Sequence, residues 1–197
     1  MQPAVEIASR ERELNSLSNV TVLVVLGTVT MTFGAMIAVF IIRSEAPLFW
    51  GHLHIPGLLW ATTAVLIASS VVLERARGRL ALNDQPRFFK LAAIASGLGV
   101  LFLIGQVTAW FQILHSGIVL VNNPHSWFIF LFSGLHGLHI VAGLCGLFYL
   151  LNRTRLPAGG PKYRMKTRVI AHGVSIFWHY LDFLWIVMFV LLLTWRP

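Results

Sequence analysis

The chain has 197 residues, of which 57% are hydrophobic and only 11% are charged, and its formal net charge is +8. Its mean hydropathy is +0.77. This composition excludes an ordinary soluble domain and is typical of an integral membrane protein. The single cysteine, Cys145, lies inside an apolar run, which excludes a disulfide framework and a CxxC motif.

Five apolar runs are long enough to cross a bilayer, which takes about 20 residues per helix. They cover residues 20–42, 54–73, 91–115, 126–151 and 169–195. The first run is longer than the core of a signal peptide, so we expect it to be retained. The connections are too short to fold as separate domains. The sequence therefore predicts an all-α polytopic membrane protein, a bundle of five transmembrane helices in one domain over residues 1–197.

Positive charge gathers on alternate connections between these runs. Thirteen of the fifteen Lys and Arg residues fall on one side of the predicted bundle, and only Arg43 and Arg196 fall on the other. Cytoplasmic loops carry such an excess, so we expect a cytoplasmic N-terminus and an external C-terminus. The same pattern accounts for the positive charge, so no nucleic-acid partner is expected. It would also attract anionic lipids.

Two pairs of ionisable residues interrupt the apolar runs. His136 and His139 lie in the fourth run, and His179 and Asp182 lie in the fifth. The members of each pair are three residues apart and share one helix face. At 1.5 Å per residue, each pair lies roughly 15 to 20 Å into the membrane. The two pairs can touch if the fourth and fifth helices are neighbours.

Three interpretations of these residues remain open. In the favoured one, Asp182 and the histidines satisfy one another and hold two helices in register, with Trp178 and Trp185 at the interface, because buried polar groups in membranes are usually partnered. A haem or metal site is the second, for example with His139 and His179 as axial ligands. A proton relay is the third. It has less support, because no second carboxylate continues the path from Asp182.

Other residues of the apolar runs are suited to helix contacts. Gln106 can hydrogen-bond to a neighbouring helix, and Gly134 and Gly137 allow close helix approach. The chain has no Walker, HExxH, GxSxG or Rossmann glycine pattern. We therefore predict no catalytic residue and no metal ligand in this chain.

Two motifs resemble a known family. Residues 128–143, FIFLFSGLHGLHIVAG, resemble the fourth-helix signature of subunit III of haem-copper oxidases, and residues 177–185, FWHYLDFLW, resemble its last-helix motif, usually YWHFVDVVW. Residues 68–76 are similar to the end of the family's second helix, and Ile104, Gly105, Gln106 and Trp110 are similar to its third. The resemblance covers nearly the whole chain and matches the short bacterial form with five helices.

The resemblance implies a role within a larger complex. It implies a subunit without redox cofactors that binds directly to subunit I, the holder of the haem and copper, in a cytochrome c oxidase complex that also contains subunit II. Such a subunit supports the integrity and proton uptake of a proton-translocating oxidoreductase and is not itself catalytic. Contact with membrane phospholipid and a place in the bacterial plasma membrane are also implied.

Three positions depart from the family pattern. Val29 and Ala109 stand where members commonly carry a glutamate, and His172 stands where a glutamate is frequent. We expect these changes to weaken any proton-related role of those acids and to leave the scaffold role intact. A quinol oxidase subunit III and an accessory subunit of a nitric oxide reductase share the same signatures. A stand-alone b-type cytochrome is the alternative from a different class.

Overall fold

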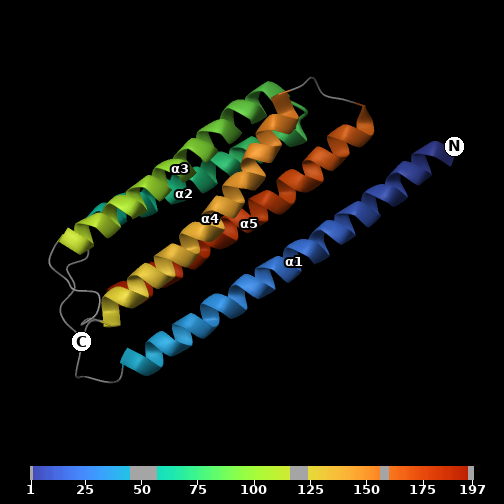
Figure 1. Ribbon diagram of the computed structural model, residues 1–197. Helices are drawn as coiled ribbons and strands as arrows, with labels where there is room; N and C mark the ends of the chain where they lie inside the picture. Colours follow the sequence, from blue (N-terminus) through green and yellow to red (C-terminus); the bar gives the residue numbers. More distant parts are fainter. Residues whose placement is uncertain (1, 45–56, 116–123, 156–159, 195–197) are drawn as a thin grey trace.

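The chain forms a bundle of long helices in the computed structural model, which describes residues 2–44, 57–115, 124–155 and 160–194. Five helices account for these ranges, and no strand occurs in them: α1 (Gln2–Ser44), α2 (Leu58–Ala81), α3 (Gln85–His115), α4 (Pro124–Arg155) and α5 (Pro161–Thr194) (Figure 1). Each contains a stretch long and apolar enough to span a membrane. The predicted all-α membrane bundle of five helices is confirmed.

The helices extend beyond most of the apolar runs that predicted them. The predicted second run ends at residue 73, but α2 continues to Ala81, and α5 begins at Pro161 rather than at residue 169. Arg, Lys and Glu are good helix formers, so a helix continues into the aqueous layer after its apolar stretch has ended. The predicted bounds at residues 54 and 195 lie outside the described residues.

A tight turn at residues 82–84 joins α2 to α3. Asn83 adopts a positive φ of 60°, a conformation that asparagine tolerates better than most residues. The carboxylate of Asp84 then accepts a hydrogen bond from the backbone N–H of Arg87 (3.3 Å), which caps the start of α3. The two helices consequently pack as an antiparallel hairpin, and theirs is the most extensive helix contact of the bundle.

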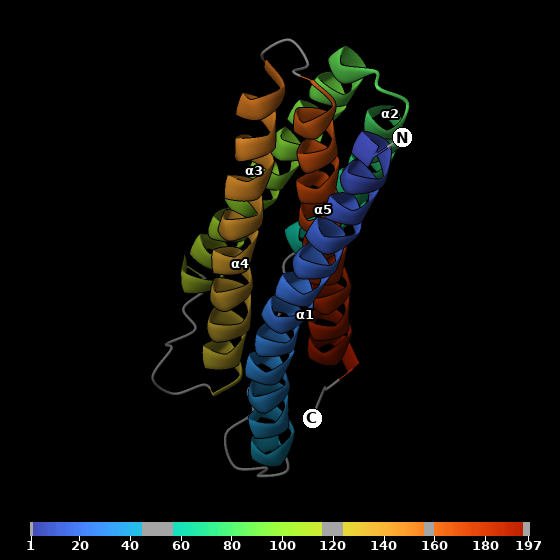
Figure 2. The same ribbon diagram turned by 90° about the vertical axis from the view of Figure 1, so that its right-hand side faces the viewer.

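The remaining helices are added to this hairpin through α4 and α5. α4 packs against α3, and α5 packs against α4, α2 and α1. α1 lies on the outside of the bundle, mainly against α5 (Figures 1 and 2). The start of α1, the α2–α3 turn, the end of α4 and the start of α5 lie at one end of the bundle (Figure 1). We call it the basic end, because the described Lys and Arg residues other than Arg43 gather there.

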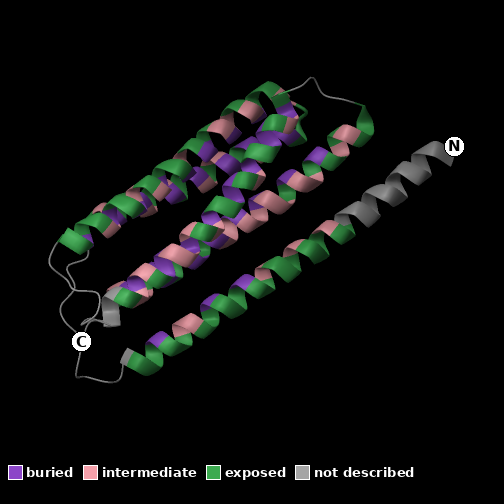
Figure 3. Ribbon diagram, in the orientation of Figure 1, coloured by how far each residue is buried: buried purple, intermediate pink, exposed green. Residues whose placement is uncertain are grey.

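Buried side chains line the inner faces of α2 to α5, whereas most of residues 16–43 of α1 are exposed (Figure 3). Trp178 of α5 is fully buried and occupies the space left by Gly99 and Gly143, on α3 and α4. α1 contributes Val29, Phe33 and Phe40 to the core. An apolar cleft of about 210 Å³ separates α1 from α4 and α5, where glycines face it from both helices.

Candidate functional site

A connected set of polar side chains lies between α2 and α5. We call it the polar strip, and it consists of Ser70, Glu74, Arg77, His172, His179 and Asp182. These residues recur at spacings of three, four and seven along their helices, so each helix presents them on one side. The strip therefore runs along the α2–α5 contact.

Hydrogen bonds connect the strip from one end to the other. The hydroxyl of Ser70 donates to the carboxylate of Asp182, and its oxygen lies 2.9 Å from Nδ1 of His179. Nε2 of His179 lies 3.4 Å from Oε2 of Glu74. The other Glu74 oxygen accepts a hydrogen bond of 2.6 Å from Arg77, which also lies 3.0 Å from Nδ1 of His172. The chain of contacts thus leads from the basic end to Asp182.

The direction of these bonds places a proton on His179. A hydroxyl has one proton, and Ser70 directs it to Asp182, so the Ser70 oxygen accepts its bond from Nδ1 of His179. His179 is thus linked through Ser70 to Asp182 and directly to Glu74.

The strip has a buried end and an open end. Asp182 is 6% exposed, and one of its carboxylate oxygens has no hydrogen-bond partner among the described residues. By contrast, the side chains of Glu74 and His179 are 48% and 39% exposed. Both helices are candidate membrane spans. The open end of the strip therefore places ionisable groups on the outer surface of the bundle.

The two histidines of α4 lie elsewhere. His136 is fully buried beside Phe102 and Trp185, with ring centroids 5.8 and 5.0 Å away, and neither of its nitrogens has a partner in the described ranges. His139 bonds the carbonyl oxygen of Leu135 (2.7 Å) and packs against Phe33 of α1 (5.5 Å).

The ionisable pair of α4 and the ionisable pair of α5 therefore do not contact each other as the sequence predicted. Each pair contacts other residues. The hydrogen bonds of His179 and Asp182 lead to α2, and the contact between α4 and α5 near mid-bundle is made by His136 with Trp185. Two facts explain the difference. α5 lies between α4 and α2, and a helix offers each neighbour a different face.

The tryptophans tie α5 to the same helix. The indole N–H of Trp178 donates to Ser69 (3.0 Å), and that of Trp185 donates to Thr63 (3.0 Å). Both acceptors are hydroxyl groups of α2. Aromatic side chains with a polar group bury a large apolar surface and still satisfy that group. Trp178 and Trp185 therefore lie at a helix interface, between α5 and α2.

The other residues singled out as helix contacts lie against α2 and α3. The amide nitrogen of Gln106 lies 3.4 Å from the Thr62 hydroxyl of α2, and its oxygen has no partner in the described part of the chain. A Cβ on Gly134 would lie 3.6 Å from Trp110, and one on Gly137 would lie 3.7 Å from Leu103. These are ordinary contacts. The tighter approach in α4 is at Gly143.

The arrangement does not bring histidines together for a haem. His139 faces α1 and His179 faces α2, as their contacts show. Among the described residues, no three His, Cys, Asp or Glu side chains are grouped as metal ligands. The chemistry available within the strip is hydrogen bonding, ion pairing and proton exchange.

Known proteins similar to this chain include several with the same name. No family model matches the chain. A probable cytochrome c oxidase subunit 3 of Nocardia farcinica is 27% identical over 194 residues, which cover 95% of this chain and 93% of that protein. A cytochrome c oxidase subunit 3 of Thermostichus vulcanus is 27% identical over 86% of this chain and 83% of its own length. The chain is thus similar to proteins named cytochrome c oxidase subunit 3 over most of its length.

A third relative is longer than the region it shares with this chain. The cytochrome c oxidase subunit 3 of Synechocystis sp. is 29% identical over 140 residues, which cover 71% of this chain but 56% of that protein. The family resemblance of the motifs is confirmed, and the departures from it can be located. Val29 is 4% exposed and Ala109 is fully buried in the apolar core. This chain packs hydrocarbon at both positions.

Proposed function

We propose that this protein acts as subunit III of a haem-copper cytochrome c oxidase, where it supports the catalytic subunit without holding haem or copper itself. The match to a subunit 3 relative over 95% of the chain carries the proposal. The relatives' names give no support to a quinol oxidase, a nitric oxide reductase or a stand-alone cytochrome. Haem and copper belong to partner subunits in this proposal.

The open end of the polar strip supports direct contact with subunit I. Glu74, Arg77 and His179 expose 48%, 37% and 39% of their side chains on helices that can span a membrane. Glu74 and Arg77 follow the apolar stretch of α2, but His179 lies within that of α5, where an ionisable side chain is costly and generally faces protein. We assign this surface to subunit I, whose facing helices should offer polar groups. Subunit II and phospholipid complete the proposed partners.

The protein is placed in the bacterial plasma membrane, with a cytoplasmic N-terminus and an external C-terminus. The basic end is the cytoplasmic end in this assignment, because Lys and Arg are enriched in cytoplasmic connections. Proton uptake, the coupled activity of the complex, then occurs on the side where the polar strip has its charged groups.

Co-purification tests the contact with subunit I. We would place an affinity tag on this chain, isolate it from membranes in mild detergent, and measure the haem recovered per mole of chain. In the double variant Glu74→Gln and His179→Gln, we expect recovered haem to fall severalfold, because the exposed polar contacts are weakened while helix volume is kept.

Arg87→Gln is the matched control for this experiment. It breaks another exposed ion pair, Arg87 with Asp84 (3.2 Å), at the α2–α3 turn, and should leave haem recovery unchanged. The amount of chain in the membrane is measured for every variant. Wild-type haem recovery by a double variant that is present at the normal level would remove the polar strip from the subunit contact, and no haem with the wild-type chain would overturn the oxidase assignment.

A further inference from the structure

Two residues in the core of the bundle carry buried polar atoms without a hydrogen bond. His136 of α4 is fully buried, and neither of its ring nitrogens has a partner among the described residues. Gln106 of α3 is 3% exposed, and its side-chain oxygen is likewise unpaired within the described ranges. Buried polar groups are hydrogen-bonded in the large majority of cases. The two unpaired groups therefore need an explanation.

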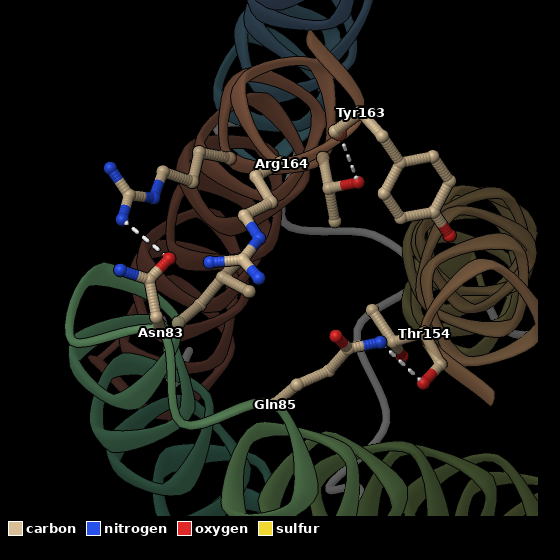
Figure 4. A pocket seen from close by; sticks show the side chains of 8 residues that line it. Asn83, Gln85, Thr154, Tyr163 and Arg164 are labelled. Atoms are coloured by element: carbon tan, nitrogen blue, oxygen red, sulfur yellow. Dashed lines mark hydrogen bonds between the residues drawn. The ribbon is translucent and has the colours of Figure 1, made fainter. Parts of the chain in front are cut away.

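Comparable polar side chains elsewhere in the bundle are paired. At the basic end, the amide of Gln85 donates to the carbonyl oxygen of Thr154 (2.9 Å) beside a small pocket (Figure 4). In the core, the hydroxyl of Ser96 donates to the carbonyl oxygen of Ala92 (2.8 Å). No described side chain or carbonyl group does the same for His136 or for the oxygen of Gln106.

Trp185 of α5 lies between these two residues and helix α2. Its ring centroid is 5.0 Å from that of His136, and its indole N–H donates to the hydroxyl of Thr63 (3.0 Å). The amide nitrogen of Gln106 lies 3.4 Å from the hydroxyl of Thr62. Contacts from His136 and from Gln106 thus lead to adjacent residues of α2.

The contact between α3 and α4 also places the two residues at one depth. Phe102 of α3 packs edge-to-face against His136, with ring centroids 5.8 Å apart. Trp110 of α3 donates to Ser133 of α4 (2.9 Å). Gln106 lies between Phe102 and Trp110 and is buried on the same side of α3 as Phe102. It therefore faces the turn of α4 that contains residues 133 and 136.

Small residues adjoin His136 and Gln106 along their helices. Ala109 follows Gln106 by three positions on the buried side of α3 and is fully buried. Gly134 and Gly137 lie beside His136 in the sequence of α4, and a Cβ at either position would be 3.6 Å or more from its nearest neighbour. A single water molecule needs only about 10–15 Å³.

The unpaired atoms are complementary to water. An uncharged imidazole has one N–H donor and one acceptor nitrogen, and the amide oxygen of Gln106 is an acceptor. Water can accept a hydrogen bond from the imidazole and donate one to the amide oxygen at the same time. We propose that His136 and Gln106 bind an internal water molecule, which bridges α4 and α3 within the membrane-spanning part of the bundle. The proposal does not depend on the oxidase assignment.

Magic-angle-spinning NMR of the protein in lipid bilayers tests for this water directly. The protein, with its partner subunits where they co-purify, carries isotope-labelled nitrogen in its histidine side chains, and magnetisation is transferred to these nitrogens from water protons. The signal of His136 is identified by its loss in His136→Leu. We expect strong transfer to His136 in the wild-type protein, and a severalfold weaker transfer in Gln106→Leu, because the water has lost one of its two ligands.

Thr62→Val is the matched control for Gln106→Leu. It removes the hydroxyl beside the amide nitrogen of Gln106 and leaves the amide oxygen in place, so transfer to His136 should stay at the wild-type level. Absence of transfer in the wild-type protein would overturn the proposal. Equal transfer in the wild-type protein and in Gln106→Leu would also overturn it, because Gln106 would then not hold the water.

Thermal unfolding in detergent tests the same bridge by the sign of the change. Removing an isolated unpaired polar group leaves stability unchanged or raises it, whereas removing one ligand of a bridging water leaves the other ligand unpaired. We therefore expect Gln106→Leu and His136→Leu each to lower the unfolding temperature by a few degrees. The double variant should lose less than the sum of the two, because the two residues act through one water.

His136→Gln separates the hydrogen bond from the shape of the ring. An amide side chain keeps one donor and one acceptor, so this variant should unfold at a higher temperature than His136→Leu. Thr62→Val measures the part of the Gln106→Leu effect that comes from the amide nitrogen. Higher unfolding temperatures in both leucine variants, or fully additive losses in the double variant, would contradict the bridge.

Discussion

Trp178 is the residue on which three helices of the bundle depend. Its indole fills the space beside Gly99 of α3 and Gly143 of α4, and its N–H donates to Ser69 of α2. In lipid, helices associate through such packing and hydrogen bonds, because hydrocarbon removes most of the hydrophobic driving force between them. The two glycines therefore contribute to the interface, because their lack of a side chain makes room for the indole.

Adding a methyl group at Gly99 should disrupt this packing. A Cβ there would lie 2.7 Å from Cη2 of Trp178 and 3.1 Å from Leu144. We expect Gly99→Ala to destabilise the folded bundle by about 1–3 kcal/mol, the usual cost of overpacking a core. Thermal unfolding in detergent would measure it.

Gly97→Ala is the control for this prediction, because nothing lies within 4 Å of a Cβ at Gly97 on the same helix. Alanine has a better helix propensity than glycine, so Gly97→Ala should be neutral or stabilising. Equal stability of the two variants would show that Trp178 is not closely packed against Gly99.

At the same scale, the sequence identified the ionisable residues but not their partners. His179 and Asp182 stand out because they interrupt an apolar run, and periodicity places them on one face of a helix. Ser70 is a common residue in membrane helices, and Glu74 directly follows the predicted second run, so it resembled a loop charge. Only the helix arrangement shows that α2 supplies the second carboxylate that the proton-relay interpretation lacked.

Among the helices, α1 has the weakest attachment to the rest. Between residues 16 and 43, its buried side chains are Val29, Phe33 and Phe40, and the cleft of about 210 Å³ separates part of it from α4 and α5. Phe33 is 1% exposed and lies against the ring of His139. Such a helix opens locally at a lower free energy than the core helices do.

Shortening Phe33 should loosen α1 selectively. We expect Phe33→Ala to raise hydrogen exchange of α1 amides severalfold while leaving α3 unchanged. The free-energy cost should fall below the ~3–5 kcal/mol of a water-soluble core, because lipid can solvate the exposed surface. Met31→Ala, at a position 80% exposed on the same helix, is the control. Equal exchange in both variants would contradict the role of Phe33.

Apolar runs predicted the number and order of the helices but not most of their ends. The length of an apolar run reflects the thickness of hydrocarbon that a helix crosses. In α2, the helical hydrogen bonds continue beyond the run, through Glu74 and the arginines that follow it. This is why the connection between α2 and α3 shrinks to the turn at residues 82–84. The contacts at the basic end, including Arg168 with Ala81, follow from that extension.

In the molecule as a whole, positive charge is concentrated at one end of the bundle, the basic end. The α2–α3 turn and the start of α5 lie together there, and Arg168 joins them. Moving this end across a membrane would require many Lys and Arg residues to pass through hydrocarbon, at about 2.5–3.5 kcal/mol for each one at the centre. The orientation in the membrane is therefore set by the distribution of charge rather than by any single residue.

Cysteine labelling of intact spheroplasts should show the basic end facing the cytoplasm. With Cys145→Ala as background, Gly57→Cys should react with a membrane-impermeant maleimide from outside, whereas Lys162→Cys should react only after the cells are opened. Gly57 immediately precedes α2, and Lys162 lies in the first turn of α5. The starts of these two helices lie at opposite ends of the bundle. The reversed pattern would contradict the orientation and would place the charged part of the polar strip on the external side, where proton uptake from the cytoplasm could not use it.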